Sequence, residues 1–286
     1  MQACPENGQD WPRDCRNRAA SGAMDTVAPT LRSPHAILLC AGLGSRLLPL
    51  TADRPKCLIE VGGRTILEHQ VAALREAGVG GISIVGGYRF DKLGAFVAER
   101  WAEDERPELL LNPFYALSSS ISSVWVARHR LTAPFCLLNG DTIYAPALVA
   151  DGLLRARAGL NLFVEPVGEV EIDDMLVRLD DDRVVAVGKD LPHGLAQHRS
   201  LGFVVGDGRE GYADALDRTI REVEGAQRFH HAIVDRLAHE GEVHAVRFEG
   251  GTWTEIDRPE DIARWHGDAA DARVSKAVAS LSSRSH

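Results

Sequence analysis

The chain has 286 residues, of which 45% are hydrophobic and 26% are charged, values typical of a globular protein with one large domain. Its formal net charge of −9 argues against nucleic acids and anionic membranes as partners, because both bind basic surfaces. The hydrophobic runs are shorter than the roughly 20 residues of a membrane-spanning helix, and the five cysteines, which show no metal-binding spacing, favour a reducing cytoplasm.

The two ends of the chain lack periodic hydrophobic patterns. Residues 1–33 contain no continuous apolar segment of the kind found in a signal peptide, so we expect a disordered extension, and Met24 stays open as an alternative start. Residues 267–286 are small and polar and predict a flexible tail. The folded domain is therefore expected to span residues 34–266.

Strand and helix patterns alternate through the first half of this domain. The helix at 65–79 has the clearest signals, because Thr65 and Glu68 form a capping box at its start and Gly78 marks its end. The alternation predicts an α/β fold with a mostly parallel central sheet flanked by helices. Strands are predicted at 35–41, 81–87, 108–112, 134–141 and 160–166, and helices at 65–79, 91–101, 120–130 and 146–158.

The pattern changes after about residue 167. Residues 175–189 alternate between apolar and polar and contain an acidic turn at 180–182, which predicts an antiparallel hairpin. We therefore expect a small antiparallel insertion that supplies part of the site. Further strands are predicted at 200–206 and 242–248, and further helices at 212–223, 229–241 and from residue 258.

A glycine-rich turn with two cations follows the first strand. Residues 41–45, AGLGS, can turn with few Cβ clashes, so their backbone amides can approach an anion closely. Arg46 follows directly and Lys56 lies ten residues further on, which suits a triphosphate. A Walker motif is absent, and Leu47 stands where a dinucleotide fingerprint needs a third glycine. For the glycines alone, an inert tight turn is the alternative.

Acidic residues follow two other predicted segments. Asp141 is the last residue of the strand predicted at 134–141. Glu255 and Asp257 lie two residues apart, so on an extended segment they point the same way. Ligands of open α/β sheets bind outside the carboxyl ends of the strands, so we expect both segments to meet the glycine turn there. Glu260 and Asp261 instead suit the first turn of a helix.

Residues 41–74, AGLGSRLLPLTADRPKCLIEVGGRTILEHQVAAL, resemble the signature of nucleotidyltransferases that join a nucleoside triphosphate to a phosphorylated small molecule. The resemblance extends over about residues 35–266. The segments NPFYALSSSISSVWVAR, LNGDTIY, DDMLVRL, AVGKDLP and SLGF resemble the branch that contains phosphocholine and phosphonate cytidylyltransferases. The resemblance implies a Rossmann-like fold of the nucleotide-diphospho-sugar transferase type.

The resemblance also implies a Mg²⁺-dependent reaction of a nucleoside triphosphate, CTP being favoured, with a phosphate- or phosphonate-bearing acceptor. It implies that Asp141 and Asp257 hold Mg²⁺ and that Lys189 meets the acceptor's phosphate. That phosphate is already ionised and acts as the nucleophile, so no general base is needed. The expected catalytic residues are Arg46, Lys56 and Lys189, and the expected nucleotide-binding residues are Ala41, Gly42, Leu43, Gly44, Ser45, Arg46, Lys56, Gly87, Ser119, Ser120 and Gly140.

Glu255, Tyr88 and Arg199 are weaker site candidates, and Tyr88 is considered for stacking on a base. Ser119 and Ser120 stand where related cytidylyltransferases often carry asparagines. Arg199 stands where an acidic residue is common, which would disfavour a cationic acceptor group such as choline. The histidines are interpreted as surface or packing residues.

Two alternatives to a cytidylyltransferase stay open. One is a sugar-1-phosphate nucleotidylyltransferase that uses UTP, GTP, ATP or dTTP, because the glycine turn would hold phosphates and read no base. The other is a nucleotide-binding regulatory protein without catalysis, against which the presence of all four of Arg46, Lys56, Asp141 and Asp257 argues. The acceptor, the pathway and the oligomeric state, with a homodimer among the options, are left undecided by the sequence.

Overall fold

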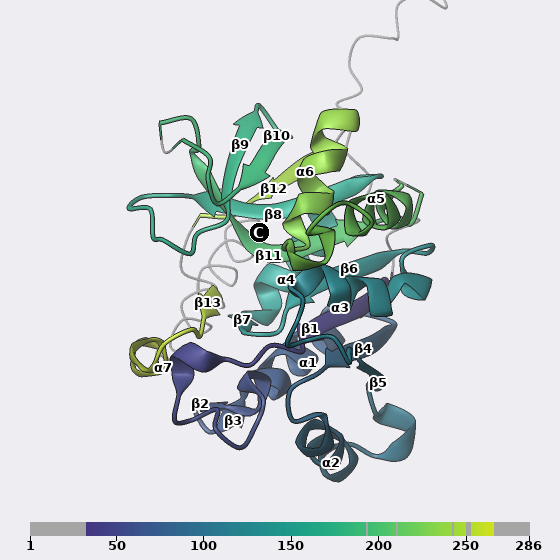
Figure 1. Cartoon of the computed structure of the whole chain (residues 1–286), viewed down its shortest axis with the longest axis vertical. Helices are drawn as coiled ribbons and strands as arrows, with labels where there is room; N and C mark the ends of the chain where they lie inside the picture. Colours follow the sequence, from purple (N-terminus) through teal and green to yellow (C-terminus); the bar gives the residue numbers. More distant parts are fainter. Residues whose placement is uncertain (1–32, 193, 210, 242, 250–252, 266–286) are drawn as a thin grey trace, which may run out of the picture.

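A computed structural model describes residues 33–192, 194–209, 211–241, 243–249 and 253–265, so the expected extension and tail, apart from Ser33, lie outside the described residues. Its main feature is a nine-stranded sheet with the order β5-β4-β1-β6-β11-β8-β12-β10-β9 (Figure 1). The strands are β1 (His35–Cys40), β4 (Gly81–Gly86), β5 (Glu108–Leu111), β6 (Phe135–Asn139), β8 (Leu160–Pro166), β9 (Leu176–Asp180), β10 (Arg183–Gly188), β11 (His198–Gly206) and β12 (Val243–Arg247).

Two short ribbons stand apart from this sheet: β2 (Glu60–Val61) pairs with β3 (Arg64–Thr65), and β7 (Thr142–Tyr144) pairs with β13 (Trp253–Glu255). The helices are α1 (Ile66–Glu76), α2 (Phe90–Arg100), α3 (Ser120–Val126), α4 (Pro146–Arg155), α5 (Tyr212–Ile220), α6 (His231–Glu240) and α7 (Pro259–Arg264). Short 3-10 helices occur at Ser45–Leu47, Lys56–Leu58, Glu103–Glu105, Arg128–Arg130 and Gly225–Gln227.

The sheet is mixed, which corrects the expectation of a mostly parallel one. Strands β5, β4, β1 and β6 are parallel, and β12 is parallel to β8. Strand β11 instead runs antiparallel to both β6 and β8, and β10 is antiparallel to β9 and β12. The chain leaves β8, forms the expected β9–β10 hairpin and returns as β11 in the reverse direction. Because β11 is buried on both faces, its sequence is a continuous apolar run, and such a run does not show whether the strand is parallel or antiparallel to its neighbours.

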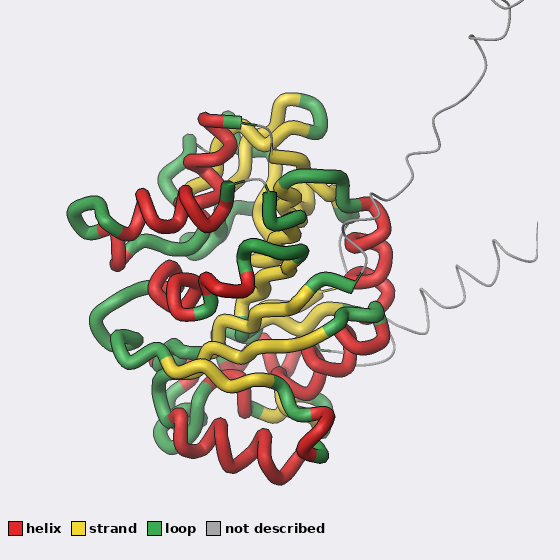
Figure 2. Tube along the Cα trace, turned by 90° about the vertical axis from the view of Figure 1, so that its right-hand side faces the viewer, coloured by secondary structure: helices red, strands yellow, loops and turns green. Residues whose placement is uncertain are grey.

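Helices cover both faces of the sheet (Figure 2). Alternate residues of β1 show how: Leu38 packs in the core under α1, α2 and α4, and Ile37 packs in the core under α3, α5 and α6. A third, smaller cluster joins the segment after β1 to the two ribbons. Its buried members are Leu47, Ile59, Val61, Ile66, Ile143 and Ile256. Among the described residues, no helix combines the length and the apolar character needed to cross a bilayer.

The predicted capping box of α1 is confirmed. The backbone N–H of Glu68 donates to Thr65 Oγ1 at 3.2 Å, and the backbone N–H of Thr65 donates to Glu68 Oε2 at 2.8 Å. Gly78 follows the helix with a left-handed φ of 77°. The predicted helices at 120–130 and 212–223 are shorter than expected, because α3 ends at Val126 and α5 ends at Ile220.

Replacing the cap should weaken the domain. We expect Thr65→Ala to lower the free energy of unfolding by about 1 kcal/mol, because an amide at the start of α1 loses its side-chain acceptor. Thr65→Ser keeps the hydroxyl and is the control. Urea unfolding followed by circular dichroism measures both variants, and equal losses for the two would contradict the role of the hydroxyl.

Candidate active site

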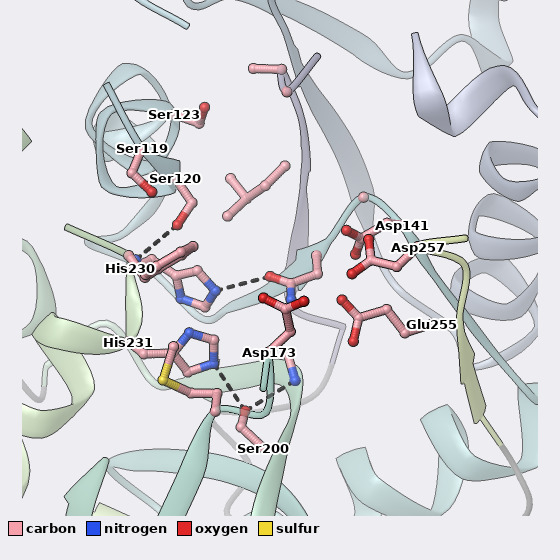
Figure 3. Close-up of a pocket in the computed structure, with 18 of the residues that line it drawn as sticks. Ser119, Ser120, Ser123, Asp141, Asp173, Ser200, His230, His231, Glu255 and Asp257 are labelled. Atoms are coloured by element: carbon pink, nitrogen blue, oxygen red, sulfur yellow. Dashed lines mark hydrogen bonds between the residues drawn. The ribbon is translucent and has the colours of Figure 1, made fainter. Parts of the chain in front are cut away.

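A cavity of about 400 Å³ lies at the carboxyl ends of β1 and β6, where ligands of such sheets bind. Its wall is built by the loop after β1, the start of α3, the residues after β6, the segment 173–175, Lys189, the start of α6, and β13. Figure 3 shows carboxylates along one side and serines and histidines along the other. Expected site residues in its lining are Ala41, Gly42, Leu43, Arg46, Ser119, Ser120, Gly140, Asp141, Lys189, Glu255 and Asp257.

Three carboxylates meet at one side of this cavity. Asp141, Glu255 and Asp257 each place an oxygen within 4.8 Å of the others. The short ribbon explains how distant segments meet, because Glu255 of β13 pairs with Thr142 of β7 and the N–H of Ile256 donates to the carbonyl of Asp141 at 2.9 Å. A set of carboxylate oxygens at this spacing suits a hard divalent cation.

Lys56 holds two of these carboxylates. Its Nζ lies 2.9 Å from Asp141 Oδ2 and also contacts Asp257 Oδ1. Burial opposes a charge on Lys56, but the carboxylates of Asp141 and Asp257 outweigh it and raise the pKa of Lys56 above its ordinary value. Burial likewise opposes a charge on Asp141, and Lys56 outweighs it and lowers the pKa of Asp141. The lysine therefore favours the ionised form of Asp141.

Glu255 differs from its two neighbours. Desolvation by the surrounding protein, followed by the like charges of Asp141 and Asp257, raises the pKa of Glu255 to about 8, although the side chain is exposed. Glu255 therefore takes up a proton more readily than Asp141 does.

The cations of the site are linked by a carboxylate that the sequence analysis did not select. Asp173 Oδ2 contacts Arg46 Nη1, and Asp173 Oδ1 lies 3.3 Å from Lys189 Nζ. Arg46 also lies 3.1 Å from Asp257 Oδ2. Burial opposes a charge on Asp173, but Lys189 and Arg46 outweigh it and lower the pKa of Asp173. Asp173 thus occupies, between two cations, the kind of position in which a phosphate would be held.

Comparisons with known proteins agree with this geometry. Residues 36–168 match the MobA-like NTP transferase domain. The CMP-5'-(3-aminopropyl)phosphonate synthase of Streptomyces rubellomurinus is 29% identical over 235 residues, which cover 79% of this chain and 37% of that one. The bifunctional IPC transferase and DIPP synthase of Rubrobacter xylanophilus is 32% identical over 255 residues, covering 85% of this chain and 55% of that one. The chain is thus similar to proteins of the nucleotidyltransferase superfamily.

A solved structure supports the same fold. The CTP:phosphocholine cytidylyltransferase of Streptococcus pneumoniae superposes with a TM-score of 0.67 at 23% identity, over 82% of this chain and 97% of that one. Together with the relatives above, this similarity confirms the expected resemblance to the cytidylyltransferase branch of the superfamily. The chain spans only 37% to 55% of the length of the first curated relatives that it matches.

The glycine loop after β1 is packed tightly against Lys56. Gly44 has a left-handed φ of 61°, and a Cβ there would lie 3.0 Å from Lys56 Cβ. Gly42 and Leu43 face the cavity, whereas Gly44, Ser45 and Lys56 lie behind it among the described residues. Gly87 also lies behind it, where a Cβ would lie 2.8 Å from the carbonyl of Ala41.

The serines at the start of α3 have different local partners. The backbone N–H of His230 donates to Ser120 Oγ at 2.9 Å, and Asn112 Nδ2 donates to Ser123 Oγ at 3.0 Å. Ser119 lines the cavity, and its hydroxyl has no partner among the described residues. Of Ser119 and Ser120, the two predicted nucleotide-binding serines at the start of α3, Ser119 is therefore the one whose hydroxyl is not engaged within the described residues.

Two weaker candidates, Tyr88 and Arg199, do not line this cavity. The Tyr88 hydroxyl donates to the carbonyl of Ala52 at 2.7 Å, and it is Tyr115 that lines the cavity. Arg199 lines an adjoining cavity of about 720 Å³, where it binds Glu165 at 2.6 Å and Asp174 at 3.2 Å. Because two carboxylates balance its charge, Arg199 does not provide the free cation on which the expectation against a cationic acceptor depends.

Sequence reasoning also missed two histidines in the cavity wall. His230 and His231 are buried and their rings lie 4.1 Å apart. His230 Nε2 lies 3.0 Å from Asn139 Oδ1, and His231 Nε2 lies 3.0 Å from Ser200 Oγ. Both histidines stand at the start of a predicted amphipathic helix, where a packing role was expected. No local sequence pattern distinguishes a packing histidine from one that lines a cavity.

Removing the carboxylate of Asp173 should strengthen anion binding. We expect Asp173→Asn to bind pyrophosphate about 2- to 5-fold more tightly, because the anion no longer competes for partly exposed ion pairs with Arg46 and Lys189. Isothermal titration calorimetry without divalent metal measures this. Asp174→Asn removes the same charge from the same loop but leaves both pairs intact, and an equal gain in that control would contradict a specific role for Asp173.

Proposed function

We propose that this protein transfers a cytidylyl group from CTP to a small molecule bearing a phosphate or phosphonate, and releases pyrophosphate. The observation that carries the proposal is the meeting of Asp141 and Asp257 with Lys56 and Arg46 beside the glycine loop. A regulatory protein without catalysis would have no need of this arrangement of charges.

CTP is the donor that the relatives favour. Two of them are named for CMP or CTP, and one, the CTP:phosphoglutamine cytidylyltransferase of Campylobacter jejuni, is 49% identical over 59 residues. Those names also describe acceptors with a phosphonate or a phosphate group. We place the catalytic domain at residues 34–266, and the free, buried Cys40, Cys57 and Cys136 suit a reducing cytoplasm.

The triphosphate is proposed to lie along the loop after β1. Gly42 and Leu43 line the cavity, and Gly42 has no Cβ that would keep a phosphate from its backbone amide. Arg46 offers a guanidinium fork to phosphate oxygens once Asp173 is displaced. Lys56, held against the carboxylates, contributes fixed positive charge close to the reacting phosphorus.

The carboxylates of Asp141 and Asp257 are proposed to hold Mg²⁺, with Glu255 adjoining them. Oxygen donors within 4.8 Å of one another fit such an ion, which takes few protein carboxylates and keeps several waters. When bound, Mg²⁺ would neutralise phosphate charge and so reduce repulsion between the two anionic substrates. Lys189, which also lies over the ring of Phe229 at 4.7 Å, is proposed to hold the acceptor's phosphate.

The proposal is tested by pyrophosphate release. We expect release from CTP with Mg²⁺ and at least one acceptor from a panel of phosphocholine, 2-aminoethylphosphonate and glucose 1-phosphate. UTP, GTP, ATP and dTTP serve as competing donors, and thermal shift with each nucleotide gives an independent readout of binding. Release with glucose 1-phosphate and a nucleotide other than CTP would favour a sugar-1-phosphate nucleotidylyltransferase instead.

The metal assignment has its own test. Asp141→Asn should lower kcat by at least about 100-fold, because it removes charge from the proposed Mg²⁺ site while keeping the side-chain shape. The exposed Asp104→Asn is the matched control and should retain full activity. Full activity of Asp141→Asn with Mg²⁺, at unchanged thermal stability, would overturn the assignment.

A further inference from the structure

Asn139 stands at the centre of the cavity wall and has one free hydrogen-bonding group. It is the last residue of β6, two positions before Asp141. Its backbone carbonyl accepts from Gln70 Nε2 at 2.6 Å, and its side-chain Oδ1 faces His230 Nε2 at 3.0 Å. Its Nδ2 has no partner among the described residues, although the residue lines the cavity. The amide therefore offers a donor to a ligand.

His230 determines which end of the amide faces the cavity. Because Oδ1 can only accept, His230 Nε2 must carry the proton, and the buried Nδ1 is then a bare lone pair. The opposite orientation of the amide would place the proton on Nδ1, leaving a buried N–H without a partner, which proteins rarely tolerate. The ring is nine-tenths buried or more and is tied to α3 through the bond from its backbone N–H to Ser120 Oγ.

Gly202 of β11 makes room for the free end of the amide. Gly202 has a left-handed φ of 69°, and a Cβ at this position would collide with Asn139 Nδ2. The amide nitrogen therefore lies against β11, whose residues Ser200, Leu201 and Gly202 line that side of the cavity.

The geometry of in-line displacement at phosphorus decides which of the two substrates binds on the β11 side of the cavity. The pyrophosphate leaves along the glycine loop, so the attacking phosphate must arrive from the opposite side of the reacting phosphorus. We infer that Asn139 donates a hydrogen bond from Nδ2 to an oxygen atom of the acceptor and that His230 is the positioning residue that orients it. This inference rests on the proposed function, because the direction of attack belongs to that reaction.

The test uses CTP as the donor and, as the acceptor, the member of the panel above that the wild type turns over fastest. It compares the KM values of the wild type and its variants. Asn139→Ala is expected to raise KM for that acceptor about 10-fold, the usual effect of losing a hydrogen bond to a phosphate-bearing ligand, with KM for CTP changed less than about 2-fold. His230→Phe should raise the same KM less, about 3-fold, and His230→Gln, which keeps an N–H donor, should restore part of the loss.

Asn139→Ser is a second variant should the alanine variant not fold, and His239→Gln, an exposed change on the same helix, is the control. An unchanged KM for the acceptor in the Asn139 variants, or a rise in KM for CTP of the same size, would overturn the inference.

Isothermal titration calorimetry with 2-aminoethylphosphonate and phosphocholine, in the presence of CMP in place of CTP, tests the role of Asn139 separately from the proposed function. Binding to the wild type that is weakened in Asn139→Ala supports the inference independently of turnover. Equal binding to both proteins overturns the inference alone. Absence of binding to the wild type, together with absence of pyrophosphate release, overturns the proposed function and the inference with it.

Discussion

The site depends on the pairing of β7 with β13, two strands of three residues each. This ribbon carries Asp141 at one end of its first strand and Glu255 and Asp257 at the end of its second, more than 110 positions later in the sequence. The backbone bond from Ile256 to the carbonyl of Asp141 fixes the register. Because side chains alternate along extended backbone, a shift of one residue would turn the second pair of carboxylates away.

Bringing three carboxylates together creates repulsion that the fold must offset. Lys56 does so from within, since it is held by the 3-10 helix after Pro55 and contacts two of the carboxylates. Arg46 does so from the cavity side, where its Nη1 lies 3.1 Å from Asp257 Oδ2. Lys56 and Arg46, which stabilise the carboxylate cluster, are also the cations proposed to bind phosphate. The same two charges therefore serve the fold and the proposed reaction.

Local patterns predicted most elements, because strands and capped helices depend on residues close in sequence. Thr65 and Glu68 marked the start of α1, and the glycine turn, Asp141 and Asp257 were placed correctly at one edge of the sheet. The direction of β11 was not predictable, because a strand buried on both faces looks the same in either direction. Asp173 and His230 were missed for a related reason: their partners Arg46, Lys189 and Asn139 lie far away in sequence.

The small cluster of Leu47, Ile59, Val61, Ile66, Ile143 and Ile256 has a consequence for how such a domain can diversify. It seats the segment after the glycine loop and both strands of the acidic ribbon on one apolar support. Strands β8, β9, β10 and β11 contribute no buried residue to this cluster. Substitutions in those strands can therefore reshape one wall of the cavity without changing the apolar support that sets the spacing between the glycine loop and the carboxylates.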